Sequence, residues 1–261
     1  MDNIKFVTFN LRCVWKDWGY DNENAFVHRA GFVYDKITSE LPDVIVFQEV
    51  PDTHIKLMER MLPEYAFYGQ FRDEHFEGEG LYTAIRKERL QVLSFDTYWI
   101  SPTPYVPGSR YENQSDCPRI CVTVKVRDKV SGNIFRTFNV HLDHISDEAR
   151  VLGMNCVLDR LEYYLADDDI PFIIAGDFNA KPDSKVIDMC NHYEKRPIFD
   201  ATAKLPESFH DWGKRKDCKI DYIYMSQNFK DKVKASYIWD DEHTGIYLSD
   251  HYPVCVEFDP Q

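Results

Sequence analysis

Several short apolar segments of this sequence end on a side chain that can bind a metal ion or a phosphate group. The residues at these ends are Asn10, Glu49, His141 with Asp143 and His144, and Asp177 with Asn179, while Asp250 and His251 open the last segment. Asp221 lies within an apolar segment, where a carboxylate costs free energy unless it is paired. Since strand ends at a common edge often form ligand sites, we expect these side chains to gather there.

These residue types suit the hydrolysis of a phosphate ester, in which negative charge must be neutralised and a water molecule made nucleophilic. A hard cation such as Mg²⁺ or Mn²⁺, held by carboxylate oxygens, neutralises charge. A neutral His or an Asp can take the proton of the water, and Asn or protonated His can donate to phosphoryl oxygens. The His needs a carboxylate on its other nitrogen, and Asp221 is available to His251.

Each of these residues, taken alone, could have a structural role instead of a functional one. Asn10 and Asp177 are of types that commonly cap strands and helices, and Glu49 could face solvent in a turn. His251 could be a structural histidine, and Arg119 an edge-strand cation. The order and context of the motifs therefore carry the functional prediction.

The elements that must position these residues are short strands alternating with a few helices. Apolar runs rich in β-branched and aromatic residues predict strands at residues 4–9, 44–48, 119–126, 133–140, 170–175, 219–225 and 252–258. Helices are predicted from Asn22 to Ser39, from the N-cap Ser146 onward, and after Pro182. The strands are too numerous and too closely spaced for a simple strand–helix repeat, which favours a mixed α/β architecture.

Length and composition predict one folded domain over residues 1–261. The chain has 44% hydrophobic residues, enough for a full core, and no repeat or composition shift divides it. Seven scattered cysteines without a CxxC pair indicate reduced thiols, and neither a signal pattern nor a membrane-spanning apolar stretch is visible. We therefore expect a cytoplasmic protein without a membrane segment.

The net charge of −13 disfavours a protein that coats nucleic acid, because it repels polyanions at long range. A phosphate substrate stays compatible with this charge, since divalent cations held by carboxylates invert the local field.

Read in order, the motifs FN, QE, HLDH, GDFN, IDYI and SDH resemble the endonuclease/exonuclease/phosphatase superfamily, which has the fold of deoxyribonuclease I and the abasic-site endonucleases. The resemblance runs from Asn10 to Val256. It implies a four-layer α/β sandwich, in which two mixed β-sheets pack face to face with helices outside. The site would lie at one edge of that sandwich.

The resemblance also implies roles for individual residues. Glu49 matches the principal ligand of Mg²⁺ or Mn²⁺, with Asn10 beside it, and Asp250 is similar to a second carboxylate on the metal side. The cation would be the cofactor of hydrolysis.

The catalytic roles follow from the same likeness. Asp177 resembles the residue that orients or deprotonates the attacking water, and Asn179 resembles a contact to phosphate or metal. His141 matches a phosphate ligand, and Asp221 with His251 resembles the Asp–His pair of the family. Together they imply in-line attack by water without a covalent enzyme intermediate.

Longer segments resemble a bacterial branch of metal-dependent hydrolases. Arg119 matches an arginine that contacts the phosphate in related sequences, and this branch adds Asp143, His144 and His210 as candidate substrate contacts. Asp143 and His144 could equally be buried hydrogen-bonding residues behind the site, and His210 could equally be a loop histidine. Related sequences often carry a tryptophan before the PRI motif. Here Tyr111 could replace it, or the loop that faces the substrate could differ.

The substrate class stays open between members of the superfamily, which share these residues. The sequence has no basic tract that would grip a strand, so a small phosphate ester is favoured and a DNA or RNA nuclease is the alternative. A catalytically silent binding module is a second alternative, against which the intact set of ligands argues. The proline-rich segment from Ser101 to Pro118 is expected to border the site, since Arg119 follows it.

Overall fold

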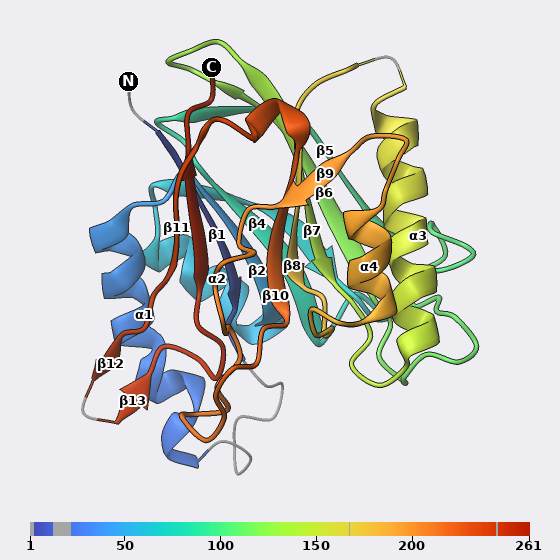
Figure 1. The fold of residues 1–261 in the computed structure, drawn as a ribbon. Helices are drawn as coiled ribbons and strands as arrows, with labels where there is room; N and C mark the ends of the chain where they lie inside the picture. The colour runs from blue at the N-terminus through green and yellow to red at the C-terminus, as the bar shows by residue number, and fades with distance from the viewer. Residues whose placement is uncertain (1–2, 13–21, 167, 244) are drawn as a thin grey trace.

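Two mixed six-stranded β-sheets form the centre of the computed structural model, which describes residues 3–12, 22–166, 168–243 and 245–261 (Figure 1). The first sheet has the order β11 (Val233–Ile238), β14 (Val254–Phe258), β1 (Ile4–Asn10), β2 (Val44–Pro51), β4 (Glu79–Arg86), β3 (Tyr65–Phe71). The second has the order β5 (Leu90–Trp99), β6 (Ile120–Asp128), β7 (Ile134–His141), β8 (Phe172–Asp177), β10 (Asp221–Ser226), β9 (Ile198–Asp200). A separate short ribbon pairs β12 (Glu242–His243) with β13 (Ile246–Tyr247).

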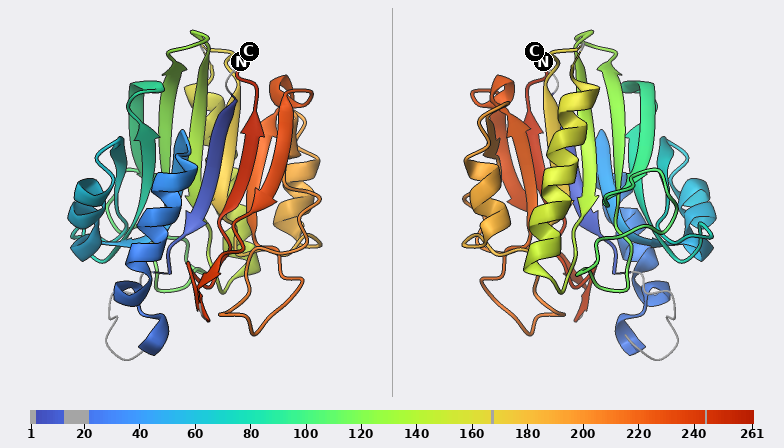
Figure 2. Two further views of the ribbon diagram at one scale, coloured as in Figure 1. Left: turned by 90° about the vertical axis from the view of Figure 1, so that its left-hand side faces the viewer. Right: turned by 90° about the vertical axis from the view of Figure 1, so that its right-hand side faces the viewer.

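Helices cover the outer face of each sheet, so the chain forms four layers (Figures 1 and 2). On the first sheet lie α1 (Phe26–Glu40), which follows a 3₁₀ turn at Asn22–Asn24, and α2 (Asp52–Met61). On the second lie α3 (Asp147–Tyr164) and α4 (Lys185–Asn191), while a further 3₁₀ turn spans Gln227–Phe229. This arrangement confirms the expected four-layer α/β sandwich. No helix of the described ranges is both long enough and apolar enough to cross a membrane.

The hydrophobic core has one part between the two sheets and one part under the helices of each sheet, because strand side chains alternate between the two faces of a sheet. In β1, Phe6 packs between the sheets whereas Val7 packs under the helices, and in β8 Ile173 and Ile174 divide in the same way. Strands buried on both faces read as continuous apolar runs, which is why they were visible in the sequence.

The observed elements confirm all seven predicted strands and the three predicted helices, with boundary shifts. The hydroxyl of Ser146 accepts a hydrogen bond from the backbone N–H of Ala149, as expected of an N-cap. The last strand begins at Val254, so Asp250 and His251 lie on the loop before it rather than at its opening. Helix α2 and several strands, among them β3, β4 and β5, were not predicted from the sequence.

A buried polar network joins the two sheets near one edge. Asn139 on β7 donates from Nδ2 to the backbone oxygens of Phe47 (3.0 Å) and Tyr82 (3.2 Å) in the opposite sheet. Its Oδ1 accepts from Nε2 of Gln48 at 2.8 Å. Asn139 and Gln48 are fully buried, so these bonds satisfy groups that water cannot reach.

The same place carries a β-bulge in β2, where the register with β4 shifts between Phe47 and Val50. A bulge bends the strand and changes the direction of a side chain. Here the affected residue is Glu49, whose φ of 56° lies in the left-handed region. The network of Asn139 therefore holds the backbone that aims Glu49.

We expect Asn139→Leu to lower the free energy of unfolding by about 3 kcal/mol or more, because it leaves several buried polar groups without partners. Thr137→Val, on the same face of β7, is the matched control and should cost about 1 kcal/mol or less, since Thr137 makes a single long hydrogen bond of 3.5 Å. Urea unfolding of the purified proteins measures both. Equal stability of the two variants would contradict the role of the network.

Candidate active site

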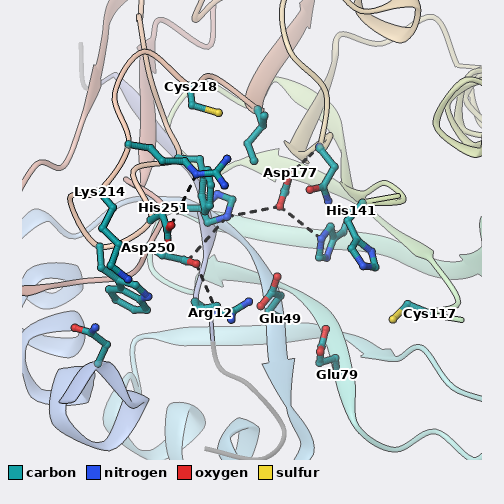
Figure 3. A pocket seen from close by; sticks show the side chains of 18 of the residues that line it. Arg12, Glu49, Glu79, Cys117, His141, Asp177, Lys214, Cys218, Asp250 and His251 are labelled. Atoms are coloured by element: carbon teal, nitrogen blue, oxygen red, sulfur yellow. Dashed lines mark hydrogen bonds and ion pairs between the residues drawn. The ribbon is translucent and has the colours of Figure 1, made fainter. Parts of the chain in front are cut away.

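A cavity of about 850 Å³ opens at the edge where the two sheets meet (Figure 3). Its location follows from the parallel pairs β1–β2 and β7–β8, whose carboxyl ends lie side by side. Asn10, Glu49, His141 and Asp177 lie at or near the ends of these four strands. The topology thus brings together four residues that are far apart in the sequence, as the strand-end pattern predicted.

Asn10 connects the two sheets at this edge. Its Nδ2 donates to Oε1 of Glu49 at 3.1 Å and to Oδ2 of Asp177 at 3.0 Å. The His141 Nε2 atom lies 3.5 Å from the same oxygen of Asp177. One oxygen or nitrogen atom from each of Glu49, His141 and Asp177 lies within 4.8 Å of the others, which is close enough for a shared metal ion.

The protonation of this cluster is set by burial and by neighbouring charges. Burial, with the negative charge of Asp221, raises the pKa of Asp177 to about 7. Burial, with the positive charge of Arg119, lowers the pKa of His141 well below its usual value, so its ring is neutral. Burial alone would raise the pKa of Glu49, but the charge of Arg12, the hydrogen bond from Asn10 and the charge of His251 together outweigh it and lower this pKa.

A second group lies against Asp177. The Nδ1 atom of His251 lies 2.8 Å from Oδ2 of Asp221, which also accepts from the hydroxyl of Ser208 at 2.6 Å. Burial disfavours a charged imidazole, yet the charge and hydrogen bond of Asp221 raise the pKa of His251 well above its usual value. The other ring nitrogen, Nε2, lies 3.9 Å from Asp177, which Figure 3 shows between His251 and His141.

Backbone conformation at two positions supports the geometry. Asn179 has φ of 50°, and its N–H donates to Oδ1 of Asp177 while its Nδ2 donates to the carbonyl oxygen of Leu142. Gly176, just before Asp177, has φ of 147°, and a Cβ there would lie 1.8 Å from the carbonyl oxygen of Val140. Only glycine allows β7 and β8 to approach this closely.

Arg119 and His144 form an adjoining part of the cavity wall. The Nη2 atom of Arg119 lies 3.0 Å from Nδ1 of His144. Arg119 is 4% exposed, and its Nε and Nη1 find no hydrogen-bond partner in the part of the chain that the structure describes. A buried guanidinium with free donors on a cavity wall is suited to bind an anion.

The other expected substrate contacts lie behind the cavity wall. Asp143 accepts from the hydroxyl and N–H of Ser115 and from the N–H groups of Ile145 and Ser146, so it holds two loops together. This agrees with the alternative of a buried hydrogen-bonding residue, whereas His144 does line the cavity.

The ring of His210 likewise lies outside the cavity lining. It packs against Tyr247 and Tyr252, with ring centroids 4.6 and 4.0 Å away, and Nδ1 accepts from the N–H of Gly213. Burial, with the charge of His251, lowers its pKa to about 4, so the ring is neutral. His210 therefore shapes the loop that follows it.

Asp250 lies on the cavity wall beside His251. The residue is 5% exposed, and its Oδ2 lies 3.6 Å from Nε of Arg12. Burial raises the pKa of Asp250. It therefore adds a further acidic group to an already crowded edge.

Other residues of the cavity had no signal in the sequence pattern. They include Arg12, Arg72, Glu79, Lys181, Trp212, Lys214 and Arg215. Arg72 and Glu79, which form an ion pair of 2.9 Å, lie at the turn between the two unpredicted strands β3 and β4. Their contact with the site depends on long-range packing, which no local motif encodes.

The proline-rich segment borders the cavity only at its end. Cys117 lines the cavity, whereas Pro102, Pro104 and Tyr111 line a separate hollow of about 520 Å³ beside α3. The hydroxyl of Tyr111 donates to the carbonyl oxygen of Leu152. The expectation that this loop forms a wall of the site was therefore wrong for most of its length. The position of Tyr111 outside the cavity agrees with the alternative that this loop differs from that of related sequences.

Comparison with known proteins agrees with this arrangement. The model of the Endonuclease/Exonuclease/phosphatase family matches residues 7–251. The chain belongs to this family. Its members are hydrolases of phosphoester bonds, so the cavity is the candidate site of such a reaction. No curated protein matches the chain by sequence.

Solved structures of the family superpose over nearly the whole chain. An endonuclease/exonuclease/phosphatase from Bacteroides vulgatus is 27% identical, with a TM-score of 0.89 and 99% of each chain covered. The mannosyl-6-phosphatase of Bacteroides thetaiotaomicron is 26% identical, with a TM-score of 0.89 and coverage of 98% and 99%. TDP2 of D. rerio, complexed with a single-strand DNA product, is 16% identical at a TM-score of 0.74, with the same coverage, and shows the shared fold alone.

The raised pKa of Asp177 predicts that the metal-free protein loses stability as the pH rises. A carboxyl group whose pKa is about 7 when folded, and lower when unfolded, stabilises the fold at low pH and loses that contribution as the pH rises through 7. Asp177→Asn cannot ionise. In EDTA we expect this variant to melt at least about 3 °C above the wild type at pH 8, with a smaller difference at pH 5.

Asp143→Asn is the control, for which we expect the opposite change in melting temperature. Burial would raise the pKa of Asp143, but its hydrogen bonds from Ser115 and the backbone lower it, so the charged form stabilises the fold. This variant should melt below the wild type at pH 8. Parallel melting curves for wild type and Asp177→Asn across this pH range would show that Asp177 carries no such cost.

Proposed function

We propose that this protein is a Mg²⁺- or Mn²⁺-dependent hydrolase of a small phosphate ester, with phosphorylated sugars as the first substrates to test. The observation that carries the proposal is one cavity that joins a carboxylate cluster to Arg119, a buried cation with free donors. The 26% identity to a mannosyl-6-phosphatase over 98% of the chain supports the choice of substrate.

The residues of the cluster fit a hard divalent cation. Glu49, Asp177 and His141 offer closely spaced oxygen and nitrogen atoms, and Asp250 adds a further carboxylate on the cavity wall. Burying several carboxylates together is unfavourable without a cation. When bound, the cation would neutralise phosphate charge and lower the pKa of a coordinated water.

The remaining chemistry belongs to the side chains of this protein. Asp177, with Asn179 beside it, would orient the attacking water and take its proton as the water oxygen bonds to phosphorus. His251, kept protonated by Asp221, would donate from Nε2 to a phosphoryl oxygen. Arg119 would hold the phosphate through Nε and Nη1. The bond between phosphorus and the ester oxygen would then break, and this oxygen would leave as an alcohol with the proton that Asp177 returns through solvent, without a covalent intermediate on the enzyme.

A DNA or RNA nuclease is the second candidate function. One observation favours it, because six basic residues line the cavity and could contact a phosphate backbone, namely Arg12, Arg72, Arg119, Lys181, Lys214 and Arg215. Six acidic residues line the same cavity and offset them, namely Glu23, Glu49, Glu79, Asp177, Asp211 and Asp250. The net charge of −13 also opposes a long polyanion, so the small ester is preferred.

Glu49→Gln should weaken Mn²⁺ binding at least about tenfold, because it removes one charge from the ligand cluster. Glu79→Gln is the matched control, since Glu79 lines the same cavity but pairs with Arg72, and its effect should be smaller. Calorimetric titration of the metal-free proteins measures both affinities. If Glu49→Gln bound Mn²⁺ as tightly as the wild type, the ligand assignment would be wrong.

A substrate panel tests the reaction itself. Hexose phosphates, inositol phosphates, nucleotides and short diesters should contain better substrates by kcat/KM than duplex DNA or structured RNA, and EDTA should abolish turnover. Asp177→Ala should lower turnover at least about a hundredfold, which excludes a contaminating enzyme. Plasmid cleavage at physiological salt that is lost in Asp177→Ala would instead favour the nuclease. Absence of turnover on every substrate would favour a silent binding module.

A further inference from the structure

Trp212 lines the cavity in a backbone conformation that bulky side chains rarely adopt. Three consecutive residues have positive φ, at 46° for Asp211, 58° for Trp212 and 78° for Gly213. Such conformations persist only where the surrounding structure enforces them, and they concentrate at functional sites. The loop therefore holds an indole at the cavity against the local preference of its backbone.

Several contacts fix this loop to the catalytic edge. The N–H groups of His210 and Asp211 both donate to the carbonyl oxygen of Asp250, at 2.9 and 3.2 Å. The N–H of Gly213 donates to the ring of His210, and the N–H of Arg215 donates to the carbonyl oxygen of His210. Asp250 itself lines the cavity beside His251. The loop that holds the indole is therefore hydrogen-bonded to the backbone of a residue of the site.

The indole is also held by a buried cation. The guanidinium of Arg29 lies 5.0 Å from the ring centroid of Trp212. Arg29 is fully buried and donates to the carbonyl oxygens of Leu11, Arg12, Asn24 and Leu248, so its position is fixed. An indole fixed in this way presents a rigid apolar surface at little entropic cost on binding.

We propose that Trp212 is the stacking surface for the organic group of the substrate, and that this group is a sugar ring. The inference rests on the proposed phosphoesterase function and adds to it the residue that selects the leaving group. The apolar C–H face of a pyranose packs on a flat indole, while its hydroxyl groups need hydrogen-bond acceptors at the rim.

The cavity supplies those acceptors. Glu23, Asn24 and Asp211 line it together with Trp212. Carboxylates only accept hydrogen bonds, which suits a ring that carries several hydroxyl donors. A nucleobase could also stack on Trp212, but it offers few donors, and the phosphates of a strand would meet these two carboxylates. A sugar therefore fits this part of the cavity better than a nucleotide.

Trp212→Gly is the decisive variant because glycine adopts positive φ without strain, so the backbone of the loop is retained. For a hexose 6-phosphate we expect kcat/KM to fall at least about tenfold, mainly through KM. For ethyl phosphate, which has no ring to stack, kcat/KM should stay within about twofold of the wild type. Phe76→Gly is the matched control, since Phe76 also has positive φ (60°) and is not among the residues that line the cavity. It should change neither value.

Two results would overturn the inference while leaving the proposed function intact. In one, Trp212→Gly hydrolyses both esters as the wild type does. In the other, it loses activity equally on both, which would mark Trp212 as a structural residue. A larger loss on nucleoside monophosphates than on sugar phosphates would replace the sugar with a base.

Binding measured without turnover separates this inference from the reaction. Calorimetry should show hexose 6-phosphate binding to the wild type and to Trp212→Phe, and at least about tenfold weaker binding to Trp212→Gly. That difference would support the stacking role even if no ester were hydrolysed. If the wild type did not bind the sugar phosphate, or if Trp212→Gly bound it equally well, the sugar site would be excluded.

Discussion

The crowding of buried carboxylates at one edge of the sandwich is the constraint on which the rest of the site depends. Asp177, Asp221 and Asp250 are each at most 5% exposed, and Glu49 lies beside them. Within the protein, Asn10 and two cations, Arg12 and protonated His251, offset part of this charge. Burial, together with the neighbouring carboxylates, still raises the pKa values of Asp177 and Asp250 in the metal-free chain. A site left short of positive charge attracts a cation, which in turn attracts a phosphate.

The stable interior of the sandwich holds these buried carboxylates together, although their mutual repulsion is unfavourable. Two parallel strand pairs end at the same edge, and the buried bonds of Asn139 and Gln48 hold the bulge that aims Glu49. Glu49, Asn179 and Trp212 all have positive φ and lie on the cavity wall. Strain at these positions is tolerated because each adjoins a rigid strand or an anchored loop. Preorganised groups of this kind need little rearrangement during the reaction.

Local sequence signals predicted the site residues that lie at the ends of strands. Asn10, His141 and Asp177 were visible because each follows a buried apolar run whose end the sheet topology fixes. His210 was expected to be a substrate contact or a loop histidine, and its ring lies behind the wall, since side-chain direction in a loop depends on partners such as Tyr252. Trp212 was not predicted, because its role follows from contacts with the distant Arg29. Arg72 and Glu79 were not predicted either, because Arg72 follows β3 and Glu79 begins β4, two strands that the sequence pattern did not reveal.

The difference between the charge of the cavity and the charge of the whole chain provides a physical basis for substrate size. Six Lys and Arg residues offset six Asp and Glu residues in the cavity, whereas the whole chain carries a net charge of −13. Charges act over roughly 8–10 Å in physiological salt, so a small phosphate inside the cavity interacts mainly with Arg119 and its neighbours. A long polyanion would extend beyond that range and meet a predominantly acidic surface. Its first phosphate would be attracted as strongly as that of a sugar, but each additional phosphate would add repulsion. The charge pattern therefore selects against length, while the cavity selects the group attached to the phosphate.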